Sequence, residues 1–552
     1  MILAGVALNP FNAHYQFDSF AVPILVAYLT ALAVLSIYGI HRCWLVYTYV
    51  RWRHNAPTAP AVPAKWPSVT IQLPTYNERY VIARLVDAVA KFDYPSELLD
   101  IQVLDDSTDE TREVARACVE QWQRRGLPIR YMHRSDRSGF KAGALEEGLK
   151  TATGELVAMF DADFIPGPDF LRRTVPYFVD SKLAVVQTRW TYLNRSYSLL
   201  TEIESLMLDG HFVVEQGSRS RSGAFFNFNG TAGLWRRVAI EDAGGWQHDT
   251  LTEDTDLSYR AQLRGWRFLY LQDVECPSEL PVEMNAFKVQ QARWSKGLIQ
   301  TAKKLLPRIL ESDASVRVKA EAFFHLTAGI TSPIMVLFSL LLLPASFVPL
   351  DRHPLLSLWI NLCGLSSTAA VVAFYLVSQH SLYPRSWKKS ILYLPLLFSL
   401  GIDLALSNTK AVMEALLGHS SDFVRTPKYN IDGDDGAWHK KQYWSPAGWV
   451  PYLEIAFGIF YIFVLVSMWQ RRNYLILPFV VTFILGFLGI GFMSLMQRGW
   501  KQLREGVRPA SSSRVQPVVS AVAFPSSRKE PDRLPFLESA PAVKASGEST
   551  GD

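Results

Sequence analysis

The segment LVAMFDADF, residues 156–164, is a short apolar run that ends in an Asp-x-Asp triplet. Its length and composition are typical of a buried strand. Three similar runs alternate with three helical patterns, at residues 69–73, 101–104 and 129–132 and at residues 79–91, 111–125 and 141–151. Strands that alternate with helices predict an α/β domain with a mostly parallel sheet, covered on both faces.

Acidic residues follow three of these runs, and the first is Glu78, at the end of the polar stretch 74–78 after the run at 69–73. Asp105 and Asp106 follow the run at 101–104, and Asp161 and Asp163 follow the run at 156–160. Ligands of parallel sheets bind outside the carboxyl ends of the strands. Carboxylates that crowd there repel one another, so we expect them to hold a cation or to accept hydrogen bonds from ligand hydroxyls.

Asp161 and Asp163 are the predicted metal ligands. An Asp-x-Asp triplet arises by chance about once or twice in a chain of this length, and residues 254–256 and 432–434 also fit the pattern. Only 161–163 directly follows a strand-like run. Mg²⁺ typically takes one or two carboxylates besides phosphate oxygens and water. We therefore expect Mg²⁺ or Mn²⁺ on Asp163, with Asp161 contacting the metal or a ribose.

Two helix starts carry further candidate residues. Lys141, in GFKAG at 139–143, offers a cation and helix N–H groups to a phosphate, or is simply an exposed lysine at a helix start. Thr252 precedes Glu253 and Asp254, and these three residues also fit an ordinary helix N-terminus. In the functional interpretation, Asp254 is a general base that takes a proton from an acceptor hydroxyl.

The string QQARW at 290–294 is the most specific motif. By chance it is expected in about one chain of this length in a hundred. Helical spacing brings Gln290, Arg293 and Trp294 close together, where Trp294 can stack on a sugar ring and Arg293 can bind phosphate or hydroxyl groups. An amphipathic interfacial helix with Lys296, Lys303 and Lys304 explains the same string and is compatible with this role.

Long uncharged segments predict an integral membrane protein. The run at 20–40 is long enough to span, and the basic residues Arg42, Arg51 and Arg53 after it place the following domain in the cytoplasm. Five further candidate spans lie at 322–350, 355–377, 390–406, 450–468 and 474–496. The span at 390–406 is short and contains Asp403, so we expect it to be re-entrant or tilted at the interface, which leaves the C-terminus cytoplasmic.

The overall charge bears on the partners of the chain, and the composition divides the chain into parts. The net charge of +5, with 19% charged residues, is too small and dispersed to indicate a nucleic-acid partner. The sequence predicts four parts: 1–55 with the membrane helix at 20–40, a soluble domain at 56–300, interfacial and membrane helices at 301–498, and a basic stretch with a disordered tail at 499–552.

These motifs resemble the family-2 glycosyltransferases, in particular the processive cellulose synthase-like membrane synthases. The order Asp105-Asp106, Asp161-x-Asp163, Thr252-Glu253-Asp254 and Gln290-x-x-Arg293-Trp294 matches the family's D, DxD, TED and QxxRW series. The strings QVLDDSTDET, DGHFVVEQ, FNFNGTAGLWRR and QQARWSKG are most similar to the mannan and glucomannan synthase branch. The resemblance implies a GT-A-like, Rossmann-like domain inserted between transmembrane helices.

The resemblance also implies residue roles. It implies that the donor contacts Asp105, Asp106, Lys141, Asp161, Gln290 and Arg293, that Asp254 is the base, and that the acceptor contacts Trp294, Asn229, Gly230 and Thr231. The segment 419–449 is similar to a gating loop through Phe423, Thr426 and Lys428, although Arg425 replaces an aliphatic residue of that pattern. Arg504 and Arg508 are similar to a cyclic-di-GMP signature, but no regulatory barrel is expected after them.

We therefore expect an inverting, metal-dependent synthase that uses a UDP- or GDP-hexose to extend a β-linked glucan, mannan or glucomannan at the cytoplasmic face of a bacterial inner membrane or its equivalent. Its partners are the donor, the growing polysaccharide, membrane lipid and export proteins of the envelope. Two alternatives remain open: a ceramide-type transferase that adds a single sugar to a lipid, and a transporter or scaffold with an inactive transferase domain.

Overall fold

The computed structural model describes residues 21–347, 354–419, 423–433, 436–445 and 448–507. The chain divides into two compact units, Met1–Leu503 and Arg504–Asp552. Of the second unit only residues 504–507 are described, so most of the basic stretch and tail expected at 499–552 lies outside the described residues. Helix α17 (Gly491–Val507) continues through the start of that stretch.

A seven-stranded sheet forms the centre of the soluble domain, in the order β3-β2-β1-β4-β6-β5-β7. Its strands are β1 (Val69–Thr75), β2 (Leu99–Asp105), β3 (Ile129–His133), β4 (Leu156–Met159), β5 (Leu183–Tyr192), β6 (Gly233–Arg236) and β7 (Arg267–Ser278). Only β6 pairs antiparallel, with β4 and with β5. The prediction of a mostly parallel sheet is confirmed.

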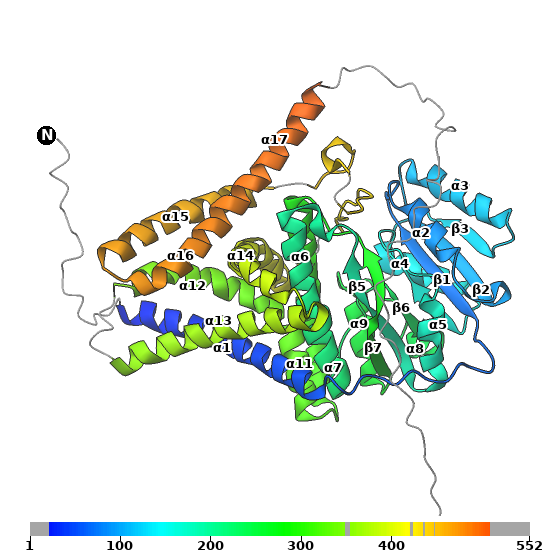
Figure 1. Ribbon diagram of the computed structural model, residues 1–552, viewed down its shortest axis with the longest axis horizontal. Helices are drawn as coiled ribbons and strands as arrows, with labels where there is room; N and C mark the ends of the chain where they lie inside the picture. The colour runs from blue at the N-terminus through cyan, green and yellow to red at the C-terminus, as the bar shows by residue number, and fades with distance from the viewer. Residues whose placement is uncertain (1–20, 348–353, 420–422, 434–435, 446–447, 508–552) are drawn as a thin grey trace, which may run out of the picture. The chain divides into compact units, whose positions relative to one another are not determined.

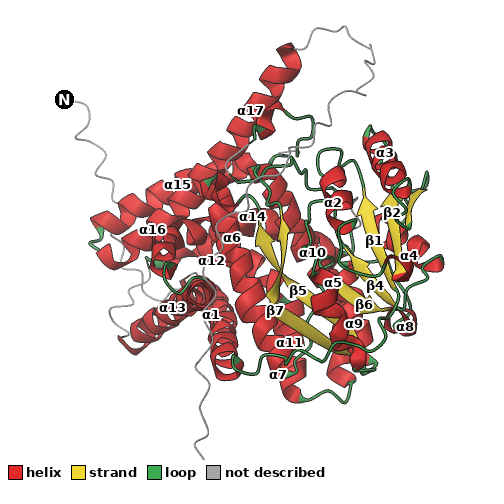
Figure 2. Ribbon diagram, turned by 45° about the vertical axis from the view of Figure 1, so that its right-hand side comes forward, coloured by secondary structure: helices red, strands yellow, loops and turns green. Residues whose placement is uncertain are grey.

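Helices cover both faces of this sheet (Figure 2). One face packs against α2 (Ile82–Val89), α3 (Thr111–Gln123) and α5 (Phe170–Thr174), and the other against α4 (Phe140–Lys150), α8 (Arg237–Asp242) and α9 (Glu253–Leu263). Both faces of the strands are therefore buried, which explains their continuous apolar runs. The chain leaves β1 toward β2 on one side and reaches β4 on the other, so a ligand crevice is expected at the carboxyl ends of these strands.

Six helices in the described residues are long and apolar enough to cross a membrane, at 22–52, 328–345, 358–382, 387–417, 450–470 and 477–499. They are built from α1 (Ala21–Trp52), α12 (Thr331–Ala345), α13 (Pro354–Leu382), α14 (Leu394–Leu417), α15 (Val450–Gln470), α16 (Leu477–Ile484) and α17. These helices support the prediction of a multi-pass membrane protein. In Figure 1, α1, α12, α13, α15 and α16 run lengthwise beside one another.

Helix α1 is longer than the expected span at 20–40. Its 32 residues give a length of about 48 Å, which exceeds a hydrocarbon core of about 30 Å. Its last turns reach the soluble domain, where buried Tyr49 lies against Gly217, and the Tyr49 hydroxyl is 2.6 Å from Ser381 Oγ near the end of α13. The helix continues through the basic residues after position 40. Their long side chains can extend and place the charged group in polar surroundings.

Helix α14 has 24 residues and is longer than the run at 390–406. It is seen end-on in Figure 1, across the direction of its neighbours. Both ends lie along α10 (Met284–Glu311): Leu397 belongs to the same buried cluster as Phe287, and Lys303 donates to the carbonyls of Ala415 and Leu416 at 3.0 and 2.9 Å. The predicted length was too short, and the predicted orientation at the membrane interface stays a prediction, since this segment is also long and apolar enough to span.

Candidate active site

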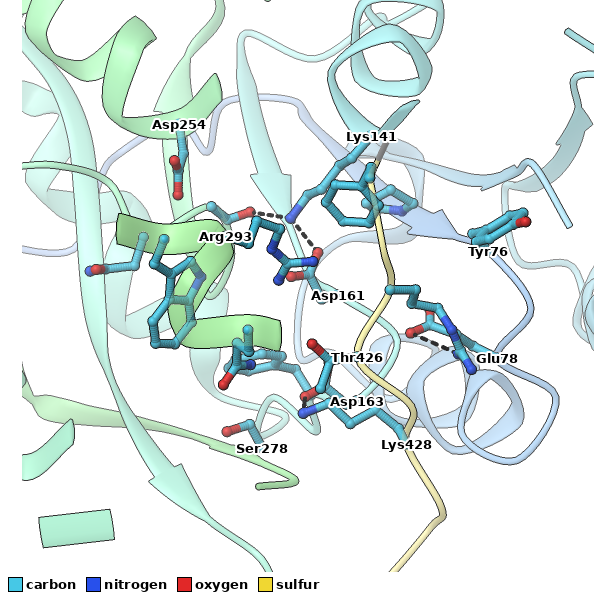
Figure 3. A pocket seen from close by; sticks show the side chains of 18 of the residues that line it. Tyr76, Glu78, Lys141, Asp161, Asp163, Asp254, Ser278, Arg293, Thr426 and Lys428 are labelled. Carbon is cyan, nitrogen blue, oxygen red and sulfur yellow. Dashed lines mark hydrogen bonds and ion pairs between the residues drawn. The ribbon is translucent and has the colours of Figure 1, made fainter. Parts of the chain in front are cut away.

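One cavity opens at the carboxyl ends of β1, β2 and β4 and extends to α10 and to the loop after α14 (Figure 3). It brings together thirteen residues singled out in the sequence, which are Asp106, Lys141, Asp161, Asp163, Asn229, Gly230, Asp254, Gln290, Arg293, Trp294, Phe423, Thr426 and Lys428. Asp105 and Thr231 do not line it. Motifs spread over more than 300 residues of sequence thus meet in one place.

Each carboxylate of the Asp161-x-Asp163 pair faces a lysine. Lys141 Nζ lies 2.5 Å from Asp161 Oδ1, and Lys428 Nζ lies 2.8 Å from Asp163 Oδ2. Both lysines point at this pair in Figure 3. Burial raises the pKa of Asp161, and Lys141 opposes that effect.

A divalent cation fits this pair only together with a ligand. The described residues contain no cluster of three or more acidic, histidine or cysteine side chains placed to hold a metal. Two carboxylates provide hard oxygen ligands of the kind that Mg²⁺ and Mn²⁺ take, and phosphate oxygens of a donor provide the rest. Asp161 and Asp163 therefore suit a metal that arrives with a diphosphate.

Asp254 begins helix α9 at the edge of the cavity. Its Oδ1 accepts the Thr255 N–H at 2.7 Å. Burial and the neighbouring carboxylate of Glu253 raise the pKa of Asp254 to about 7, against the opposing charge of Lys141. A carboxyl group with a pKa near neutrality is suited to accept a proton.

The segment from Asn229 to Thr231 connects the base to the acidic pair. The Gly230 carbonyl accepts from Lys141 Nζ at 3.0 Å, and the Thr231 hydroxyl accepts the Asp161 N–H at 2.9 Å. Thr231 therefore supports the Asp161 backbone from outside the cavity. Gly230 has φ of +80°, and a Cβ on it would lie 2.9 Å from Asp254 Oδ2, so this position needs glycine for both conformation and space.

The two aspartates after β2 differ in their surroundings. Asp105 is fully buried and accepts from Tyr131 Oη at 2.6 Å and from the Ser107 N–H at 2.9 Å. Asp106 lines the cavity and is held by Arg134 at 2.8 and 2.5 Å. Asp105 thus stabilises the strand end, and Asp106 is the member of the pair that a ligand can reach.

Helix α10 carries Gln290, Arg293 and Trp294 into the cavity opposite the strand ends. The Arg293 guanidinium lies 4.5 Å from the centre of the Phe423 ring, and Arg293 Nη1 donates to the Val424 carbonyl at 3.3 Å. The loop after α14 is therefore fastened to the QxxRW helix.

Arg425, the residue that departs from the gating-loop pattern, pairs with Glu78 at 3.5 Å and lies over the Tyr443 ring at 4.4 Å. Burial raises the pKa of Glu78 to about 7, with Arg425 opposing the shift. Arg137 lies 3.4 Å from the centre of the Tyr76 ring, beside Asp106 in the cavity lining. Glu78 was expected among the acidic groups at this edge of the sheet, but no signal in the sequence indicated a specific role for Glu78, Tyr76 or Arg137.

Comparisons with known proteins agree with this geometry. Residues 67–297 match the family model described as "Glycosyltransferase like family 2". The chain is 45% identical to glucomannan 4-beta-mannosyltransferase 1 of Oryza sativa subsp. japonica over 299 residues, which are 52% of this chain and 57% of the relative. It is 46% identical to glucomannan 4-beta-mannosyltransferase 2 of Arabidopsis thaliana over 254 residues, 45% of this chain and 48% of the relative. The chain thus spans about half the length of the curated relatives it matches.

Among solved structures, the mannosyltransferase PcManGT from Pyrobaculum calidifontis, in complex with GDP-Man and Mn²⁺, aligns with a TM-score of 0.49 and 23% identity, covering 66% of this chain and all of that chain. The family model spans the sheet, its acidic strand ends and the QxxRW motif on α10. The resemblance to the family-2 glycosyltransferases is thus confirmed over residues 67–297, and the names of the relatives match the mannan and glucomannan synthase branch.

Proposed function

We propose that this protein is an inverting, metal-dependent synthase that transfers mannosyl units from GDP-mannose to a growing β-linked mannan or glucomannan. The observation that carries the proposal is the meeting of Asp106, Asp163, Asp254 and Trp294 in one cavity. The mannosyltransferase names of the relatives support the choice of sugar.

In this proposal the acidic pair and the basic side chains bind the leaving diphosphate. Asp161 and Asp163 would hold a divalent cation that stabilises charge on the departing nucleotide. Lys141 and Arg293 line the same cavity and add positive charge next to it. Asp254, deprotonated, takes the proton of the acceptor hydroxyl as that oxygen attacks the anomeric carbon from the opposite side, which inverts its configuration.

The helices give the proposal its membrane topology. The segment 423–433 reaches the cavity of the soluble domain, so this loop and the domain lie on the same side of the membrane. With α14 at the interface, α12 and α13 cross out and back, and α15 crosses out again before the last span returns. The soluble domain, the loop and the end of α17 are then all cytoplasmic, in keeping with Arg42, Arg51 and Arg53 after the first span.

This function is tested by an assay on membranes that contain the protein. GDP-mannose, GDP-glucose and UDP-glucose are supplied one at a time in labelled form with Mg²⁺ or Mn²⁺, and the product is sized and digested with a β-mannanase. GDP-mannose is expected to give a mannanase-sensitive polymer, which Asp254→Asn and a chelator abolish. Asp180→Asn, which removes an exposed ion pair with Arg267 outside the cavity lining, is the matched control and keeps activity. Transfer of one sugar to lipid, or donor binding without turnover, would reject the synthase.

A further inference from the structure

A π-helical turn at His211–Gln216 separates α6 (Leu199–Gly210) from α7 (Gly217–Ser222). Such turns are rare and frequently occur at functional sites. This one contains most of the string DGHFVVEQ, to which the proposed reaction assigns no role. It places His211 against Asn229, a residue that lines the cavity.

The hydrogen bonds of Asn229 fix the orientation of its amide. Asn227 Nδ2 donates to the Phe228 carbonyl at 3.1 Å and to Asn229 Oδ1 at 3.2 Å. The atom of Asn229 that faces Asn227 must therefore be the oxygen. His211 Nε2 lies 3.0 Å from the same oxygen, so the imidazole donates to it.

The other ring nitrogen of His211 also donates. Nδ1 lies 2.9 Å from Glu215 Oε2, and a carboxylate only accepts. Burial opposes ionisation of Glu215, but Arg219 and His211 hold the pKa of Glu215 well below its usual range. Gln216 Nε2, 3.5 Å from His211 Nε2, has its own acceptor in the Asn227 carbonyl at 3.1 Å. His211 thus donates from both ring nitrogens and is clamped between Glu215 and Asn229.

This clamp leaves the amide nitrogen of Asn229 free. Asn229 Nδ2 is buried and has no hydrogen-bond partner among the described residues. Asn229 directly precedes Gly230, on which a Cβ would lie 2.9 Å from Asp254 Oδ2. A buried N–H₂ group normally has a hydrogen-bond acceptor. Next to the base, a neutral oxygen such as that of a sugar hydroxyl can be this acceptor.

We propose that His211 is a positioning residue that, with Glu215 behind it, directs the Asn229 amide N–H₂ at a hydroxyl oxygen of the acceptor sugar. The inference rests on the proposed function and adds to it the contact that orients the acceptor hydroxyl toward Asp254. Donor binding is proposed to use Asp106, Asp161 and Asp163, and none of these three takes part in the hydrogen bonds described for the clamp.

A double-mutant cycle tests the clamp with GDP-mannose as donor and β-1,4-mannooligosaccharide as acceptor. His211→Phe keeps the ring volume without the donors, and Asn229→Ala removes the amide. Each is expected to lower kcat/KM for the acceptor about tenfold or more, and the double variant to be no worse than Asn229→Ala alone. Hydrolysis of GDP-mannose by water is expected to stay within about twofold of wild type, because water does not need this contact.

Conservative and control variants separate positioning from folding. His211→Gln keeps one amide donor and is expected to recover at least half of the loss in kcat/KM for the acceptor. It replaces His211→Phe in the double-mutant cycle if that variant does not fold. His380 packs edge-to-face against Trp387 and does not line the cavity, so His380→Phe is the matched control and is expected to leave kcat/KM unchanged. Thermal unfolding of every variant is compared in one detergent.

The outcomes distinguish this inference from the proposed function. Wild-type protein that makes no polymer from any donor overturns the function. Active wild type in which the effects of His211 and Asn229 multiply, or in which hydrolysis and transfer fall together, overturns only the clamp.

Discussion

Lys428 Nζ lies 2.8 Å from Asp163 Oδ2, so an ammonium group from the loop after α14 contacts the carboxylate proposed to bind metal. Lys428 also donates to the Glu279 carbonyl, and both Lys428 and Asp163 are buried. A divalent cation on Asp163 must therefore compete with this ammonium group. The loop and the metal are linked through one carboxylate.

Lys428→Met is expected to bind Mn²⁺ more tightly than wild type when no nucleotide is present. Removing the competing ammonium leaves Asp163 available, and a tenfold tighter Kd would correspond to about 1.4 kcal/mol. Free Mn²⁺ measured by electron paramagnetic resonance gives the affinity. Lys410→Met, which removes an exposed lysine 3.9 Å from Glu414, is the control. Equal affinities for Lys428→Met and wild type would show that the contact does not compete with metal.

The pKa of about 7 for Asp254 predicts a pH profile. A general base acts when deprotonated, so kcat is expected to fall about tenfold per pH unit below 7 and to level off above it. Asp254→Asn is expected to lose about 10²- to 10⁴-fold in kcat and its remaining activity to be flat with pH. A wild-type profile that is flat between pH 5 and 8 would contradict the assignment.

The same shift predicts a separate effect on stability. Burial raises the pKa of Asp254 above its value in the unfolded chain, so the folded state binds the proton more tightly. The stabilisation is present below pH 4 and is lost as pH rises through about 7. Asp254→Asn is therefore expected to raise Tm at pH 8 and not at pH 4, measured by thermal unfolding in detergent. A lower Tm at pH 8 would indicate a mainly structural role.

The sheet and the acidic residues were predictable because their signals are local. Asp161 and Asp163 follow a strand directly, and Asp254 starts a helix, so short windows of sequence reveal them. The pairing of Glu78 with Arg425 joins segments far apart in the chain, and nothing near either residue indicates the other. The same holds for the clamp on Asn229, which depends on how a π-helical turn packs against a loop.

For the membrane helices too, some features were predictable from the sequence and others were not. Asp403 is fully buried, as expected of a carboxylate in a membrane segment, whereas the re-entrant or tilted placement of its helix stays a prediction. The end of α1 did not follow from charge, because its last turns continue past the basic residues and pack against the soluble domain, where Tyr49 lies against Gly217. Helix boundaries that depend on tertiary contacts leave no local mark.

Gly230→Ala is expected to lower kcat at least tenfold without loss of the fold. The added Cβ meets Asp254 Oδ2 at 2.9 Å, and the φ of +80° costs a non-glycine residue about 1–3 kcal/mol. Asp254 must move to make room, which displaces the base from the acceptor. Gly223→Ala, at φ of +73° with open space around it, is the matched control for backbone strain alone. If both variants lose the same activity, the contact with Asp254 does not matter.

Lys288, on the same helix as Trp294, joins three membrane helices through buried charges. Its Nζ lies 2.7 Å from both Glu454 oxygens on α15, 3.2 Å from Asp403 Oδ2 on α14 and 3.0 Å from Ser494 Oγ on α17. Lys288→Met leaves two buried carboxylates without their cation. Such a loss typically destabilises a protein by about 3–5 kcal/mol, so a clearly lower Tm in detergent is expected.

Restoring neutrality separates the charge effect from packing. The triple variant Lys288→Met, Asp403→Asn, Glu454→Gln removes the whole cluster and is expected to regain most of the lost Tm, because no unpaired charge remains buried. Lys150→Met, which breaks an exposed pair with Glu147, is expected to leave Tm unchanged. Lys288 precedes Gln290 by two residues on α10. Lys288→Met is therefore also expected to reduce sugar transfer to the acceptor, to the extent that it disorders this helix. A triple variant as unstable as the single one would show that Lys288 acts through its packing and not through its charge.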